Sequence, residues 1–170
     1  VTIDPHHDSR LWLAADDGLY RSDDEGRTIT KVFAGETATV WVDPADENRV
    51  LVGGRGLWQS GDGGAIFAVA DAGGADMYVN SFTSVPVAGD KQGMLFAGSG
   101  AFRPGPAWVQ GRGVLASRDG GKTWTNVSAG LASTSVMALD ASDDGKWLLV
   151  GTRQGGLYRA DIASLIPLVK

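Results

Sequence analysis

One pattern constrains this sequence more than any other: a triplet of short β-rich runs recurs along the whole chain. The first triplet occupies residues 1–5, 10–14 and 18–22, and the second occupies 40–44, 49–53 and 56–60. The serines that end these two triplets, Ser22 and Ser60, are 38 positions apart. Self-similarity at such a spacing is typical of repeat proteins, in which each unit packs on its neighbours.

Two more triplets follow, at 81–85, 94–98 and 113–117 and at 136–140, 147–151 and 156–160. Short apolar runs separated by Gly, Asp, Asn and Pro predict strands joined by tight turns. Residues 134–139 could pass for a helix start by composition, but their place in the repeat predicts a strand. We expect the apolar tail, 164–170, to form the outer strand of the last unit, with Pro167 tolerated at a sheet edge.

These units predict an all-β protein, a β-propeller of four-stranded antiparallel blades, with about four blades in this chain. The whole chain, 1–170, is then a single propeller segment. Its approximate blades are 1–35, 36–75, 76–131 and 132–170.

A second motif follows the third strand in three of the four units, at 22–29, 60–67 and 117–124. It resembles the Asp-box, Ser-x-Asp-x-Gly-x-Thr-Trp, and only the third copy is complete. The resemblance is to the Asp-box (BNR-like) β-propellers, which include sialidases, sortilin-like receptors, photosystem assembly factors and xyloglucanase-like glycoside hydrolases. It covers essentially the whole chain and implies an extracellular or periplasmic location.

The chemistry of the motif explains its residue types. Ser and Asp side chains hydrogen-bond the backbone of a tight turn, and Gly supplies the positive φ that closes a hairpin. The closing aromatic residue is expected to begin the fourth strand and to pack on the neighbouring blade. We therefore expect structural roles for Ser22, Asp24, Gly26, Ser60, Asp62, Gly64, Ser117, Asp119, Gly121 and Trp124.

Composition and charge exclude several functions. The formal net charge of −5 argues against nucleic acid, whose binding requires clustered Lys and Arg. The sequence contains no cysteine, which excludes disulfides and thiolate metal sites. No apolar run approaches the roughly 20 residues of a membrane helix, and the first residues lack a signal-peptide pattern. We expect any targeting segment to have been removed or not to be included in this sequence.

Strand parity separates the turns into two ends of the blades, with the Asp-boxes at one end. The opposite end collects a long insertion, 99–112, and a loop lengthened beyond its hairpin is more often functional. Aromatic and guanidinium side chains there suit a sugar or a protein partner. The ligand-binding candidates at this end are Phe102, Arg103, Trp108, Arg112, Arg55 and Arg153. The alternative is that the insertion covers the propeller end or packs on another subunit.

Catalytic candidates are sparse. Glycoside hydrolysis needs two nearby carboxylates, and Asp16, Asp17 and Asp76 lie at the ligand end, although Asp-Asp-Gly is also an ordinary turn. Catalytic residues therefore remain unknown. Adjacent histidines, His6-His7, and the acidic run 23–25 lack the ligand sets of metal sites, so we expect no metal and no cofactor.

The number of blades leaves ring closure open. The chain is a portion of a longer propeller, a half that pairs with a second copy, or a compact four-bladed ring. For function we expect a non-catalytic scaffold that binds a protein or a glycan. Two alternatives are a part of a secreted xyloglucanase-like (endo-glucanase) glycoside hydrolase, and a structural subunit of a larger assembly.

Overall fold

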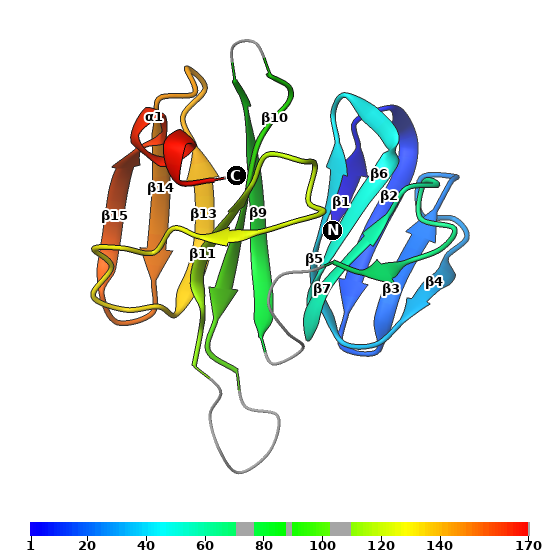
Figure 1. Ribbon diagram of the computed structural model, residues 1–170. Coiled ribbons are helices and arrows are strands. Elements are labelled where there is room, and N and C mark those ends of the chain that lie inside the picture. The colour runs from blue at the N-terminus through cyan, green and yellow to red at the C-terminus, as the bar shows by residue number, and fades with distance from the viewer. Residues whose placement is uncertain (71–76, 88–89, 103–109, 170) are drawn as a thin grey trace.

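The computed structural model describes residues 1–70, 77–87, 90–102 and 110–169. Figure 1 shows an all-β chain whose strands form successive antiparallel blades, as the repeat predicts. Blade 1 contains β1 (Thr2–Asp4), β2 (His7–Ala15), β3 (Gly18–Ser22) and β4 (Thr30–Ala34). Blade 2 contains β5 (Thr37–Asp43), β6 (Asp46–Gly54), β7 (Gly56–Ser60) and β8 (Ala68–Val69). Blade 3 contains β9 (Tyr78–Val87), β10 (Asp90–Gly100), β11 (Gly113–Ser117) and β12 (Thr125–Asn126).

Blade 4 differs from the other three. Its described strands are β13 (Val136–Ala141), β14 (Trp147–Thr152) and β15 (Gly156–Asp161), so the strand expected within 134–139 is confirmed. The outer strand expected at 164–170 is wrong, because α1 (Ile162–Leu165) and η1 (Ile166–Leu168) follow β15 instead.

The physical reason for the helix is a local cap. The Asp161 side chain accepts a hydrogen bond from the backbone N–H of Ala163, which satisfies a free donor of the first turn. Pro167 lies in the first turn of η1, where a missing N–H has no cost. The buried side chains of Ile162 and Leu165 join the apolar cluster of blades 3 and 4, so the tail still covers the core.

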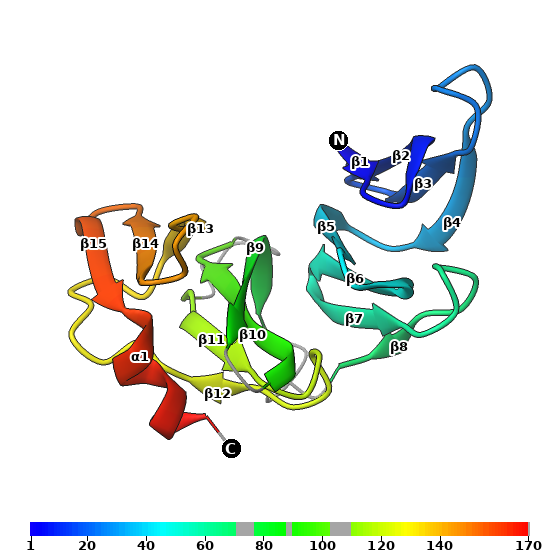
Figure 2. The same cartoon turned by 90° about the horizontal axis from the view of Figure 1, so that it is seen from above.

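The blades follow one another in an arc. Figure 2 shows the innermost strands, β1, β5, β9 and β13, along its concave side, and the arc is open between β1 and β13. Of the three expectations for closure, the compact four-bladed ring is therefore wrong for this chain. The closing step of such a ring needs contact between its first and last blades, and here they lie at the two ends of the arc.

The apolar core is divided among the junctions between blades. Trp12 and Leu19 of blade 1 pack with Val40, Val50 and Val52 of blade 2. Further clusters lie at the junction of blades 2 and 3 and at that of blades 3 and 4. Each blade is thus stabilised by burying one sheet face against the next, which is how repeat proteins form a core.

The turns are sorted onto two rims, as strand parity predicts. The Asp-box turns, between β3 and β4, β7 and β8, and β11 and β12, lie toward the upper edge in Figure 1. The β2–β3, β6–β7 and β14–β15 turns lie toward the lower edge, on the side where β10 ends and β11 begins. We call these the Asp-box rim and the insertion rim.

Candidate functional site

The three Asp-box turns share one hydrogen-bond pattern. In the first, Ser22 Oγ donates to Asp24 Oδ1 at 2.8 Å and accepts from the backbone N–H of Gly26 at 2.8 Å. The backbone N–H of Thr28 then donates to Asp24 Oδ1 at 2.8 Å. The same bonds recur at Ser60, Asp62, Gly64 and Ile66 and at Ser117, Asp119, Gly121 and Thr123.

These bonds hold the three carboxylates in their charged form. The backbone N–H of Thr28 lowers the pKa of Asp24, and the hydroxyl of Ser60 lowers that of Asp62. Burial works in the other direction at Asp119, but the hydrogen bonds from Thr123 outweigh it and its pKa is also lowered. A general acid needs a raised pKa, so this environment suits a structural carboxylate.

The closing aromatic residues connect neighbouring blades. Phe67, one residue before β8, packs edge-on against Phe33 of blade 1 with ring centroids 5.4 Å apart. Trp124, one residue before β12, packs on the cluster that contains Leu57 of blade 2. The motif therefore joins a tight turn to the contact between two blades.

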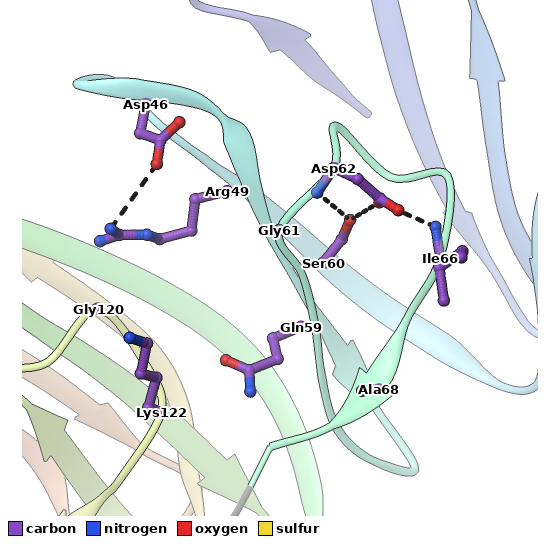
Figure 3. A pocket seen from close by; sticks show the side chains of 10 residues that line it. All are labelled: Asp46, Arg49, Gln59, Ser60, Gly61, Asp62, Ile66, Ala68, Gly120 and Lys122. Atoms are coloured by element: carbon purple, nitrogen blue, oxygen red, sulfur yellow. Dashed lines mark hydrogen bonds and ion pairs between the residues drawn. The ribbon is translucent and has the colours of Figure 1, made fainter.

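A hollow of about 580 Å³ lies on the Asp-box rim between blades 2 and 3. Figure 3 shows its lining side chains, with Asp62 turned toward Ser60 and Ile66. Arg49 in the wall forms ion pairs with Asp43 at 3.1 Å and Asp46 at 3.8 Å. The carboxylates of this hollow thus already hold turns or an arginine. The lining residues are Asp46, Arg49, Gln59, Ser60, Gly61, Asp62, Ile66, Ala68, Gly120 and Lys122.

A different cluster forms on the insertion rim around Tyr78, the first residue of β9. The ring of Phe102 stacks on that of Tyr78, with centroids 5.4 Å apart and planes 29° apart. The carboxylate of Glu36 lies near enough to Tyr78 to raise the pKa of its phenol. Arg55 joins the cluster through its backbone, which donates to the carbonyl of Glu36 at 3.1 Å and forms a β-bridge with Tyr78. We call Tyr78, Phe102, Glu36 and Arg55 the Tyr78 cluster.

The charge around Tyr78 is negative. Burial raises the pKa of Tyr78 first, and the charges of Glu36 and Asp16 raise it further. Asp16, Glu36 and Arg55 are exposed, whereas the Tyr78 ring is half-buried. The cluster thus brings residues of blades 2 and 3 and of the link between blades 1 and 2 into one surface, which combines aromatic rings with the charges of Glu36 and Arg55.

The structure distributes the predicted ligand residues unevenly. Phe102 is only 8% exposed because it stacks on Tyr78, so it does not belong to an exposed patch. Arg55 and Arg153 are exposed, and Arg112 is half-buried. Arg103 and Trp108 lie outside the described residues. Of the four predicted ligand residues that the structure describes, Phe102 and Arg55 are brought together in the Tyr78 cluster.

Another hollow, which Arg153 lines, lies on the insertion rim between blades 3 and 4. This hollow has a volume of about 310 Å³. Among the described residues its lining is polar and uncharged apart from Arg153, with Gln110, Gln154, Ser133 and Ser135 beside Ala101. Such side chains provide hydrogen-bond donors and acceptors for a polar ligand.

The predicted carboxylates also separate. Asp17 accepts hydrogen bonds from Lys31 Nζ and the Tyr20 hydroxyl, both at 2.7 Å, and these bonds lower its pKa. The charge of Asp16 raises the pKa of Tyr78, and Asp76 lies outside the described residues. Sequence reasoning missed Glu36 and Tyr78. Their positions in the repeat could have indicated them, because Glu36 lies in the link between blades 1 and 2 and Tyr78 begins an inner strand.

The two histidines have separate partners. His6 Nε2 donates to the Asp43 carbonyl at 2.8 Å, and His7 Nε2 lies 3.1 Å from Glu47 Oε2. In the acidic run, Asp23 pairs with Arg10 at 2.6 Å, and Glu25 pairs with Arg27 at 2.8 Å. Over the described ranges, no group of three or more His, Cys, Asp or Glu side chains is placed to hold a metal ion. Nor does the described part of the chain contain a helix with the length and apolar character to cross a bilayer.

Comparison with known proteins places the fold. No protein-family model matches the sequence, and no curated protein matches it. An ancestral GH74 enzyme is 22% identical with a TM-score of 0.74, over 92% of this chain and 22% of that one. The GH74 xyloglucanase from Xanthomonas campestris is 22% identical with a TM-score of 0.71, over 94% and 28%. YCF48 bound to a D1 peptide is 12% identical with a TM-score of 0.55, over 90% and 46%.

These structures are β-propellers, and the likeness shows that this chain has the β-propeller fold. The chain spans between 22% and 46% of the length of these three proteins.

Proposed function

We propose that this β-propeller segment is a non-catalytic scaffold that binds a protein or a glycan on its insertion rim. The observation that carries the proposal is the Tyr78 cluster, where Phe102 of the insertion stacks on a ring that begins blade 3. Phe102 is thereby held beside the exposed charged side chains of Glu36 and Arg55. A rigid aromatic base with exposed charges of both signs is suited to recognition.

The polar side chains of the two rims differ in their interactions. On the Asp-box rim, Asp24, Asp62 and Asp119 hold turns and Arg49 holds Asp43. On the insertion rim, Arg55 and Arg153 are exposed, and the hollow beside Arg153 has a polar lining. The exposed side chain of Arg55 and this polar hollow are the features of the insertion rim that support the proposal. We also propose an extracellular or periplasmic location, which the resemblance to the Asp-box propellers supports.

The test measures binding of two probe sets, xyloglucan oligosaccharides and a peptide array, to the whole chain. Arg55→Glu should weaken binding at least tenfold, which corresponds to about 1.4 kcal/mol. Arg27→Glu is the matched control, because Arg27 is an exposed arginine on the Asp-box rim. Equal binding by the two variants, or no binding to either probe set at millimolar concentration, contradicts the proposal.

A second candidate function is part of a glycoside hydrolase. It is favoured by two exposed carboxylates, Glu36 and Asp16, whose negative charges both raise the pKa of Tyr78. Such enzymes use two carboxylates, one of them as an acid. If this function holds, the protein hydrolyses xyloglucan, and Glu36→Gln abolishes the release of reducing ends. Asp17→Asn should keep activity, because Lys31 and Tyr20 already engage Asp17.

A further inference from the structure

The last blade of the arc presents an apolar face that the first three blades bury. One position in the second strand is equivalent in all four blades, because its partner in the third strand occupies the same place in the repeat. The four pairs are Trp12 with Arg21, Leu51 with Gln59, Phe96 with Ala116 and Leu149 with Arg159. Trp12, Leu51 and Phe96 are all 0% exposed, whereas Leu149 is 36% exposed. The difference arises because a following blade covers the first three.

The third strands repeat the same contrast. Leu157 pairs with the second-strand residue two positions after Leu149. The equivalent residues of blades 1, 2 and 3, which pair two positions after Trp12, Leu51 and Phe96, are Leu19, Leu57 and Val114. These three are at most 2% exposed, and Leu157 is 74% exposed. Trp147, Leu149, Leu157 and Arg159 share this uncovered side of β14 and β15, and we call them the blade 4 end face.

Blade 1 is uncovered on its opposite side. Leu11 pairs with Ser22 and corresponds in register to Val50 of blade 2, which pairs with Ser60. Val50 is buried against blade 1, while Leu11 and Leu13 are half-exposed and Ile3 is 64% exposed. We call Ile3, Leu11 and Leu13 the blade 1 end face. It is the kind of surface that blade 2 presents to blade 1.

The Asp-box glycines show how two blades interlock. A Cβ on Gly64 would lie 2.5 Å from the Trp12 ring, and one on Gly121 would lie 3.2 Å from Leu51. The large side chain of one blade thus fills the space over the Asp-box glycine of the next. At Gly26 of blade 1, the nearest described contact for a Cβ is Leu11 of the same blade, at 3.5 Å. The side chain equivalent to Trp12 and Leu51 that would fill this space is Leu149.

An arginine repeats the same relationship. Arg21 of blade 1 lies over Trp12 and donates to the carbonyl of Gly63 in the Asp-box of blade 2 at 3.3 Å. Arg159 occupies the equivalent register position in blade 4 and stacks on Trp147, 4.1 Å from the ring centroid. In blade 1 the residue equivalent to Gly63 is Glu25, and their φ values are alike, 61° and 69°. A carbonyl acceptor for Arg159 is therefore available in blade 1.

We propose that a second copy of this chain docks its blade 1 end face on the blade 4 end face. Leu149 then fills the space over Gly26 of the other copy, and Arg159 donates to the carbonyl of Glu25. One chain carries both complementary faces, so two arcs bind each other at both ends around a two-fold axis. Two four-bladed arcs form an eight-bladed ring, which is within the known range of propellers.

The test is the mass of the whole chain in solution, by light scattering at about 100 μM, far above the Kd of a standard interface. The expected mass is twice 17.7 kDa. Leu157→Asp and Ile3→Asp should each give a monomer, because each places a charge on one of the two end faces. Ile66→Asp is the matched control: Ile66 is 73% exposed but lies in the Asp-box turn of blade 2, so this variant stays a dimer.

Circular dichroism checks that the two monomeric variants keep the β-sheet spectrum of the parent chain. The residues that they change are exposed, so the isolated arc should keep its three inner junctions. A monomeric parent chain overturns the proposal. An open polymer that grows with concentration overturns ring closure, and a dimer that survives Ile3→Asp overturns the head-to-tail arrangement.

Discussion

Trp12 donates a hydrogen bond from its indole Nε1 to Asp4 Oδ2 at 3.1 Å, and both side chains are almost completely buried. Asp4 ends β1 and Trp12 lies in β2, so this bond joins the first two strands of blade 1. Burial raises the pKa of Asp4, but the bond from Trp12 and the backbone bond from His6 outweigh it, and the pKa is lowered. The same indole fills the space over Gly64 of blade 2.

Trp12→Phe should therefore destabilise the protein by about 1–3 kcal/mol, because the buried Asp4 carboxylate loses a donor while most apolar contact is kept. Trp41→Phe is the matched control, since Trp41 is a half-buried residue of β5. Urea unfolding followed by fluorescence measures both. Equal losses of stability would show that the bond to Asp4 contributes nothing specific.

Gly64→Ala tests the contact between blades. The substitution adds a Cβ 2.5 Å from the Trp12 ring at a residue with φ +84°. Gly130→Ala carries the same backbone strain, with φ +90°, but its Cβ has open space around it. We expect about 1–2 kcal/mol of destabilisation for Gly130→Ala from backbone strain alone. Gly64→Ala should cost about 1–3 kcal/mol more, from overpacking against Trp12. Similar unfolding midpoints for the two variants would contradict the interlocking.

Asp119→Ala tests the structural role of the Asp-box. Asp119 accepts hydrogen bonds from Ser117 Oγ and from the backbone N–H groups of Lys122 and Thr123. Their loss should reduce the free energy of unfolding by about 1–2 kcal/mol and leave ligand binding on the insertion rim unchanged. Asp143→Ala, at an exposed aspartate of the β13–β14 turn, should change stability by less than about 0.5 kcal/mol.

Acid should weaken the protein through its hydrogen-bonded aspartates. Bonds from Ser142 and Lys146 lower the pKa of Asp144 from 3.8 to about 2. The folded state therefore binds fewer protons than the unfolded state in this interval, and the contribution of Asp144 is fully present above pH 3.8. It is lost as the pH falls through about 2. Asp144→Asn should show a shallower loss of stability between pH 4 and 2, measured by thermal unfolding. A pH profile parallel to that of the parent chain contradicts this assignment.

The Tyr78 cluster makes a spectroscopic prediction. Burial and the charges of Glu36 and Asp16 raise the pKa of Tyr78, so Glu36→Gln should lower that pKa toward 10 without reaching it. Ultraviolet titration of tyrosinate, with Tyr78→Phe as the blank, isolates the signal of this residue. Glu25→Gln removes an exposed charge in the Asp-box turn and should leave the titration of Tyr78 unchanged.

Local patterns were sufficient for most of the strands. The third strand of blade 3 was expected at 113–117 and lies at Gly113–Ser117, because glycine turns delimit it on the sequence itself. The tail at 164–170 was mispredicted, since an apolar run with a proline suits an edge strand as well as a short helix. The Asp161 cap and the burial of Ile162 and Leu165 favoured the helix.

The sequence by itself determined the repeat, the strand order and the residues of the Asp-box turns, because these depend on turns and hairpins within a single blade. The tertiary structure alone decided which distant residues meet. Phe102 was expected to be exposed, but the pairing of β9 with β10, in which Gly100 lies opposite Tyr78, brings the Tyr78 ring against it. Leu149 and Phe96 hold the same place in their blades, and only the presence of a following blade separates a buried side chain from an exposed one.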